Sequence, residues 1–155
     1  MNIFVLDTNP EKAAIAQCNK HVVKMPLEAT QMLCTIFNLH NIKAPYKSCH
    51  SKHPCTLWLS KSMNNIDWLI LHTKTLFYEY TIRYKRVHKS EQVLDWCIKN
   101  KDKLQIPYIG LTPFAQAMPE QYKNKDAVIA YRAYYQNDKL KIAVWPENKS
   151  PEWIK

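Results

Sequence analysis

Apolar residues recur every three or four positions along much of this chain, which is the spacing of one face of an α-helix. The first such stretch runs from Glu11 to His40, and Pro26 within it is expected to kink the helix or to split it in two. The most regular stretch covers residues 56 to 86, where one apolar stripe extends over roughly seven turns. This second pattern predicts one long core helix.

Shorter elements are predicted from capping residues and prolines. Residues 2 to 6 form a short apolar run, and residues 7 to 10 (Asp-Thr-Asn-Pro) predict an N-cap followed by proline at the first helical position. The tail from Lys139 is interpreted as one strand or an extended segment. Three further helices are expected: one capped by Ser90, a brief one from Thr112-Pro113 to Met118, and a last one over residues 125 to 136.

Residues 41 to 54 lack apolar periodicity and are rich in lysine, histidine and proline, so they are predicted to be a surface loop. Gly110 is the only glycine, whereas hairpin-rich folds need glycine repeatedly at turns. The sequence therefore predicts an all-α, mainly helical fold, a compact single-layer bundle of about five helices with a short N-terminal extended segment. Its length suits a single domain, residues 1 to 155.

Positive charge is in excess, with 22 lysine and arginine residues against 13 acidic ones and a formal net charge of +9. Such a field attracts polyanions, so double-stranded DNA is the leading partner, with a merely solubilising surface as the alternative. The five cysteines are an odd number with no secretory signal before them, and no run of about 18 apolar residues exists. We therefore expect a monomeric cytoplasmic protein, in the host cell if the chain is viral, with no cofactor, membrane span or protein partner.

Basic and imidazole side chains concentrate in three parts of the sequence, and such side chains contact phosphates without reading base sequence. The residues predicted to bind DNA are Lys20, His21, Lys24, Lys47, His50, Lys52, His53, Arg83 and Arg86. Four aromatic residues could stack on an exposed base: Tyr46, Trp58, Tyr84 and Tyr108. The alternative is that the lysines are ordinary solvated residues and that the aromatic residues belong to the core.

One carboxylate stands out by its position. Glu28 lies seven residues after His21, so two helical turns bring both side chains to nearly the same side of the first long helix. A carboxylate there could polarise a sugar oxygen or accept a proton. The alternative is a solvated glutamate that pairs with Lys24, four residues earlier.

Cysteine and histidine occur in two groups that together could close a tetrahedral zinc site. The groups are Cys18 and His21 in the first helix and Cys49, His50, His53 and Cys55 in the loop. Because buried cysteine is commonly a small apolar residue, we expect no metal and keep a zinc-stabilised interaction module as an alternative. A serine hydrolase and a phosphate-binding loop are excluded, since both need several glycines.

Four features in this order resemble the pyrimidine-dimer DNA glycosylase family, of the endonuclease V type first known from phage. They are the short N-terminal apolar run, the helix carrying His21 and Glu28, the loop from Tyr46 to Pro54, and the long helix after it. The order and spacing are similar over residues 1 to 86. In the phage enzyme a histidine likewise precedes the catalytic glutamate by seven positions, whereas the arginines flanking that glutamate are replaced here by Leu27 and Gln31.

The resemblance implies a helical protein that kinks DNA, extrudes a base and attacks the sugar C1′ with its α-amino group, forming a Schiff base that undergoes β-elimination. Glu28 would be the catalytic acid, and the amine would belong to Met1, since a bulky second residue such as Asn2 usually prevents removal of the methionine. The predicted catalytic residues are therefore Met1, Asn2 and Glu28. The function implied is a DNA glycosylase, with or without AP-lyase activity, acting on a flipped or damaged pyrimidine. The rival interpretation is a non-catalytic nucleic-acid-binding protein.

Overall fold

The computed structural model describes residues 1–154 and is built from helices, with no strand in that range. The predicted all-α fold is therefore confirmed. Short 3₁₀ turns and one π-helical turn, Tyr135–Lys139, lie between and after the α-helices. The α-helices are α1 (Pro10–Ile15), α2 (Asn19–Leu39), α3 (Pro54–Leu59), α4 (Met63–Tyr84), α5 (Glu91–Asn100) and α6 (Ala127–Tyr134).

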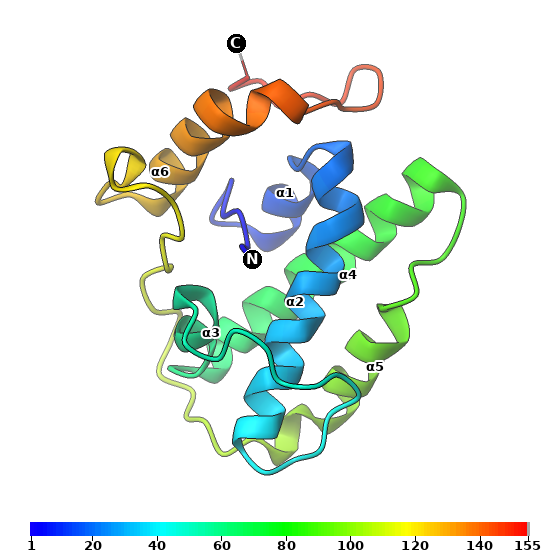
Figure 1. The fold of residues 1–155 in the computed structure, drawn as a ribbon, viewed down its shortest axis with the longest axis vertical. Helices are drawn as coiled ribbons and strands as arrows, with labels where there is room; N and C mark the ends of the chain where they lie inside the picture. The colour runs from blue at the N-terminus through cyan, green and yellow to red at the C-terminus, as the bar shows by residue number, and fades with distance from the viewer. Residues whose placement is uncertain (155) are drawn as a thin grey trace.

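The two long helices form the centre of the molecule, with α2 lying across α4 and α1 and α5 also packed against α4 (Figure 1). Their buried sides are mainly apolar, with Leu33 and Phe37 of α2 and Ile66, Leu69 and Phe77 of α4 all buried. This burial removes most of the apolar stripe of each helix from water, which is the main favourable contribution to folding. Within the described residues, no helix combines the length and apolar composition that crossing a membrane requires.

The N-terminal apolar run is buried, but it turns sharply where a short extended segment was predicted. The side-chain oxygen of Asn2 accepts hydrogen bonds from the backbone N–H groups of Ile3 and Phe4, at 2.8 and 3.1 Å. Phe4 has a φ of 45°, in the left-handed region that is uncommon for a residue with a side chain. These contacts bend the chain so that its first residues reach α2 (Figure 1).

The first predicted helix is divided at Ala16–Cys18, and Pro26 lies inside an unbroken α2. Tertiary contacts explain the position of the break, because they satisfy the backbone groups that the helix leaves unpaired. The Arg83 guanidinium donates to the carbonyls of Ile15 and Gln17, and the Tyr135 hydroxyl accepts from the N–H of Cys18. The predicted start is confirmed, since Asn9 caps α1 and Pro10 is its first residue.

The second long helix is also divided, into α3 and α4. Ser62 begins α4 as its N-cap, with its hydroxyl accepting from the N–H of Asn64 at 3.2 Å. The side chain of Asn65 donates to the carbonyl of Trp58 at 2.7 Å, so α3 is held against the start of α4 at an angle. The surface loop is confirmed from residue 41 to His53, and Pro54 is the first residue of α3.

The brief helix predicted from Thr112-Pro113 to Met118 is wrong, because this segment has no helical structure. Instead Thr112 pairs with Asn65, whose side-chain amide both accepts from the Thr112 N–H and donates to the Thr112 hydroxyl. The helix predicted over residues 125 to 136 is present as α6 and the π-helical turn after it. The tail continues as a 3₁₀ turn, Leu140–Ile142, so the strand expected there is absent from the described residues.

A buried ion pair fixes the packing of α4 against the α1–α2 junction. Arg83 and Glu79 lie one turn apart on α4, with Nη2 and Oε2 at 2.8 Å and both side chains at most 5% exposed. Lys149 from the C-terminal tail approaches the same carboxylate at 3.9 Å. Removing one member of a buried pair leaves the other charge without compensation.

The substitution Glu79→Gln is expected to lower the free energy of unfolding by about 3 kcal/mol, because it leaves the Arg83 guanidinium buried without a counter-charge. Urea denaturation followed by circular dichroism measures the change. Glu120→Gln is the matched control, since the Glu120 side chain is 86% exposed in its pair with Lys123. Equal stability of the two variants would contradict a structural role for the buried pair.

Candidate active site

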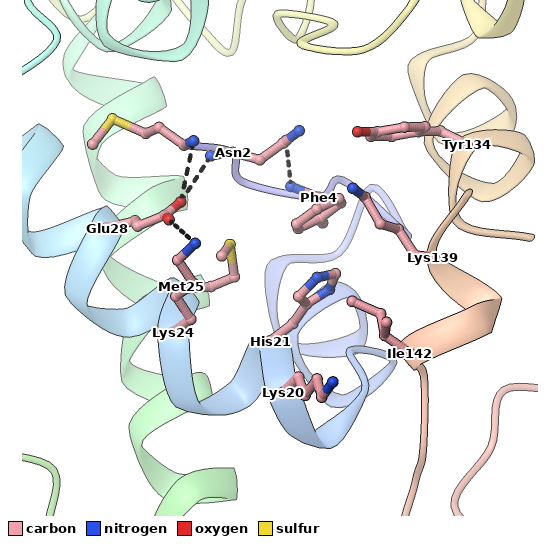
Figure 2. A pocket seen from close by; sticks show the side chains of 11 residues that line it. Asn2, Phe4, Lys20, His21, Lys24, Met25, Glu28, Tyr134, Lys139 and Ile142 are labelled. Atoms are coloured by element: carbon pink, nitrogen blue, oxygen red, sulfur yellow. Dashed lines mark hydrogen bonds and ion pairs between the residues drawn. The ribbon is translucent and has the colours of Figure 1, made fainter. Parts of the chain in front are cut away.

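A pocket of about 310 Å³ opens beside the N-terminus (Figure 2). Three parts of the chain form its walls, and two of them are more than 100 residues apart in the sequence. The N-terminal segment contributes Met1, Asn2 and Phe4, α2 contributes Lys20, His21, Lys24, Met25 and Glu28, and the C-terminal region contributes Tyr134, Lys139 and Ile142.

The Glu28 carboxylate meets the first two nitrogen atoms of the chain. Its Oε2 atom lies 3.6 Å from the Met1 amine and accepts a hydrogen bond from the backbone N–H of Asn2 at 3.1 Å. Its Oε1 atom lies 3.5 Å from the ammonium of Lys24. Because Glu28 is only 8% exposed, these contacts supply compensation for a buried negative charge. The structure therefore brings the predicted catalytic residues together at one carboxylate.

The Asn2 side chain holds the terminus in this position. Besides accepting from the backbone of residues 3 and 4, it donates from Nδ2 to the carbonyl of Ala117 at 2.7 Å. Ala117 in turn donates its N–H to the hydroxyl of Tyr131 on α6. The amine is consequently fixed by contacts with the segment that precedes α6.

His21 forms part of the pocket wall. Its ring stacks on Phe4, with centroids 4.4 Å apart and an interplanar angle of 14°, and its Nδ1 atom lies 2.7 Å from the hydroxyl of Tyr135. Burial, together with the positive charges of Lys139 and Lys24, lowers the pKa of His21 to about 4. The ring is therefore neutral at pH 7, and it would not act as the phosphate-binding cation that the sequence suggested.

His53 also faces the protein. It is the N-cap of α3, and its Nδ1 atom accepts from the N–H of Cys55 at 3.1 Å. Burial lowers the pKa of His53, as do the positive charges of the N-terminus and His50, while Glu28 and the Met1 backbone act in the opposite direction. Because the ring is partly buried and its Nδ1 atom is used within the protein, its surroundings differ from those of an exposed phosphate contact.

Of the other basic residues predicted to bind DNA, Lys20 and Lys24 are exposed at the pocket. An exposed location is also found for Lys47, His50, Lys52 and Arg86. Arg83 differs, because its guanidinium is buried against Glu79 and backbone carbonyls. Its donors are already used within the protein, so we leave Arg83 out of the proposed DNA-binding surface.

The aromatic residues suggested to stack on a base have different locations. Trp58 is in the core, 1% exposed and packed against Trp68 and Phe114. Tyr46 is partly buried, with its hydroxyl bonded to Ser90. The other two, Tyr84 and Tyr108, are exposed.

The structure gives no support to the zinc-stabilised alternative. Within residues 1–154, no three or more histidine, cysteine, aspartate or glutamate side chains gather closely enough to hold a metal ion. The backbone of Cys18 bonds to Tyr135, whereas the backbone of Cys49 bonds to Thr35, so the two groups of candidate ligands lie in different surroundings.

Five pocket residues were missed by reasoning from the sequence: Phe4, Met25, Tyr134, Lys139 and Ile142. Phe4 belongs to a run whose apolar character indicates only burial. Tyr134 lies in an aromatic-rich stretch, which marks a core as readily as a pocket. Lys139 is one lysine among many, and nothing in its neighbourhood along the chain distinguishes it from a solvated residue.

The fold and the pocket together define a class of protein: a basic helical protein in which a primary amine and a carboxylate share one cationic pocket, as in enzymes that use an amine as nucleophile. A family model described as pyrimidine dimer DNA glycosylase matches residues 1–92, more than half of the chain, which therefore belongs to that family. Membership indicates a pyrimidine dimer DNA glycosylase-like function with DNA as the substrate. No curated protein and no solved structure gives a significant match.

Acidification from pH 7 to pH 5 is expected to destabilise the protein. Burial lowers the pKa of His72 to about 4, as it does for His21, against an ordinary value of about 6.5. Between these values the unfolded chain binds protons that the folded chain excludes, so stability is full above about pH 6.5 and falls as the pH approaches 4. Each ring should contribute about 2 kcal/mol to the loss at pH 5.

Urea denaturation at both pH values, with NMR titration of the histidine rings, tests this expectation. A His21→Phe variant should show a smaller loss than the wild type. A His21 ring that titrates near pH 6.5 would contradict the buried neutral state.

Proposed function

We propose that this protein is a DNA glycosylase that removes a damaged pyrimidine from double-stranded DNA, with the Met1 amine as nucleophile and Glu28 as acid and base. The observation that carries the proposal is the 3.6 Å separation between the Met1 amine and the Glu28 carboxylate inside a cationic pocket. The family match covers both residues.

The pocket has the charge expected for a nucleotide. Lys20, Lys24 and Lys139 line it together with the Met1 amine, while Glu28 is the only acidic residue in the lining. Cationic side chains on opposite walls can bind the phosphates on either side of an extruded nucleotide. Figure 2 shows Lys24 and Lys139 approaching the pocket from different elements, α2 and the π-helical turn. The volume of about 310 Å³ is at the small end of ligand pockets, which suits one nucleotide.

The reaction begins with the amine. An α-amine is more readily neutral at pH 7 than a lysine side chain, and Glu28 Oε2 is placed to take its proton. The nitrogen lone pair then forms a bond to the sugar C1′, and the electrons of the glycosidic bond leave with the base. The departing base takes one of the two protons now on the nitrogen. The Glu28 carboxyl group then protonates the sugar ring oxygen, and the C1′–O4′ bond breaks as the nitrogen lone pair forms the C=N bond, which gives the protonated Schiff base.

Strand cleavage would follow from the same intermediate. The imine acidifies the C2′ hydrogen, so removal of that proton expels the 3′ phosphate by β-elimination. Water then releases the amine from the sugar. AP-lyase activity in this proposal therefore needs no residue beyond those that perform base removal, although it is a separate step that can be slow.

Borohydride trapping is expected to link the wild-type protein covalently to duplex DNA containing an abasic site, because borohydride reduces the Schiff base to a stable amine. Glu28→Gln should lower the rate of adduct formation by about 100-fold, since it removes the proton acceptor beside the amine. Gel electrophoresis after quenching at several times measures the rate.

Glu91→Gln on α5 is the matched control, and its adduct should form at the wild-type rate. Intact mass of the protein and of the trapped peptide identifies the amine, which would be that of Asn2, 3.1 Å from the same oxygen, if Met1 is removed. Absence of any adduct with the wild type, or an undiminished rate in Glu28→Gln, would reject the mechanism.

A non-catalytic DNA-binding protein is the second candidate, favoured by the exposed basic residues outside the pocket, such as Lys47, Lys52 and Arg86. For either function, affinity for duplex DNA should fall steeply as salt is raised. Lys24→Ala and Lys139→Ala should each reduce the slope of log affinity against log salt by about one if both lysines contact phosphates. Fluorescence anisotropy across a salt series measures the slope.

A nicking assay on the same DNA separates the two candidates. Salt-dependent binding without strand scission or adduct formation favours the non-catalytic protein. An unchanged slope in both lysine variants would show that the pocket does not hold the DNA backbone.

A further inference from the structure

An exposed apolar turn, here called the tip, lies in the segment between α5 and α6. Three large side chains there are exposed to water: Tyr108 by 61%, Ile109 by 65% and Leu111 by 47%. Gly110 lies among them with a φ of 90°, a conformation that favours glycine and that turns the chain at this point. Neighbouring exposed apolar residues on one short turn are unusual, because scattered single ones are the norm on a protein surface.

The backbone of this tip is firmly held, although its side chains are free. Pro107 accepts from the N–H of Met63 at 3.0 Å, Gly110 donates to the Asn64 side chain at 2.9 Å, and Thr112 donates to the Asn65 side chain at 3.0 Å. All three partners belong to the first turn of α4. The backbone of the tip is therefore already ordered. A partner that buries the side chains of the tip would lose little free energy to further ordering of this backbone.

The same segment leads directly to the proposed active site. Beyond Leu111 it packs Phe114 into the core and ends at Ala117, whose carbonyl accepts from the Asn2 side chain. Six steps along the chain lead from Leu111 to Ala117, which places the tip within about 22 Å of that contact. Figure 1 shows the segment following one side of the molecule beside α3. Tip and pocket are therefore close enough to contact one bound duplex.

The surroundings of the tip favour a polyanion over an apolar protein surface. Exposed Lys61 immediately precedes Ser62, whose hydroxyl accepts from the N–H of Ile109 at 3.5 Å. The nearby acid Asp67 is already paired with Lys101 at 2.6 Å. The exposed lysine can approach a phosphate while the apolar side chains reach past the backbone to the bases.

We propose that the tip formed by Tyr108, Ile109 and Leu111 is a wedge that inserts between stacked base pairs of bound DNA. Apolar side chains inserted at a base step unstack it and kink the duplex, which lets more of the protein contact the DNA. The kink assists rotation of a nucleotide into the pocket beside Glu28. This inference rests on the proposed function in one respect, that DNA is the partner.

The test uses the double variant Tyr108→Ser/Ile109→Ser in the full chain. Both positions are exposed, and the backbone contacts to α4 remain, so the melting temperature should not change. The probe is a duplex that contains a reduced abasic-site analogue with 2-aminopurine beside it. The fluorescence of 2-aminopurine rises when this base unstacks. The wild type should raise this signal on binding, and the variant at saturating protein should give about tenfold less unstacking.

Leu71→Ser is the matched control and should behave as the wild type. Leu71 is 41% exposed on α4, in a separate depression that it shares with Ile15 and Tyr78, so it is an exposed apolar side chain outside the proposed wedge. Förster resonance energy transfer between the two ends of the duplex gives an independent measure of the kink. The double variant should bend the duplex less than the wild type, and Leu71→Ser should bend it equally.

The outcomes distinguish the wedge from the proposed function. In one outcome the wild type binds DNA and forms the borohydride adduct, but the double variant unstacks and bends DNA equally well. This result overturns the wedge and leaves the proposed function intact. A wild type with no affinity for duplex DNA overturns both. Concentration-dependent self-association in sedimentation, lost only in the double variant, would show that the tip contacts protein and would also overturn the wedge.

Discussion

The contact between the Glu28 carboxylate and the beginning of the chain is the interaction on which the rest of the structure depends. A buried carboxylate requires compensation, and here Met1, Asn2 and Lys24 provide it. The contact in turn requires the N-terminal segment to turn at Phe4 and to be held by Ala117. Chain terminus, central helix and the segment before α6 are thereby joined at one buried point.

Polar side-chain contacts, some of them with residues far away in the sequence, set the boundaries of the helices. The break between α1 and α2 occurs where Arg83 and Tyr135 satisfy free backbone groups, and the break between α3 and α4 occurs where Ser62 and Asn65 do so. The Tyr135 contact also anchors the C-terminal region to the start of α2. The helix ends are therefore part of the mechanism that assembles the pocket, since α2 begins at the junction that Tyr135 holds.

The apolar spacing predicted the helical class, both long stretches and the cap at Asn9, because these depend on neighbours along the chain. Of the two outcomes expected at Pro26, a kink or a split, the split does not occur there, because α2 accommodates the proline. The observed break depends on residues more than 60 positions away. Glu28 and the terminus could be predicted from the resemblance to a family. Lys139 and Tyr134 could not, because only the folded chain brings them to α2.

The origin of the pocket walls has a consequence for how such proteins diversify. The amine and the carboxylate lie within residues 1–92, which the family shares, whereas Tyr134, Lys139 and Ile142 lie beyond them. One wall can therefore vary in shape and charge while the amine and the carboxylate stay unchanged. A lineage could acquire a new preference among damaged bases by changing its C-terminal third, while the N-terminal segment and α2 stay the same.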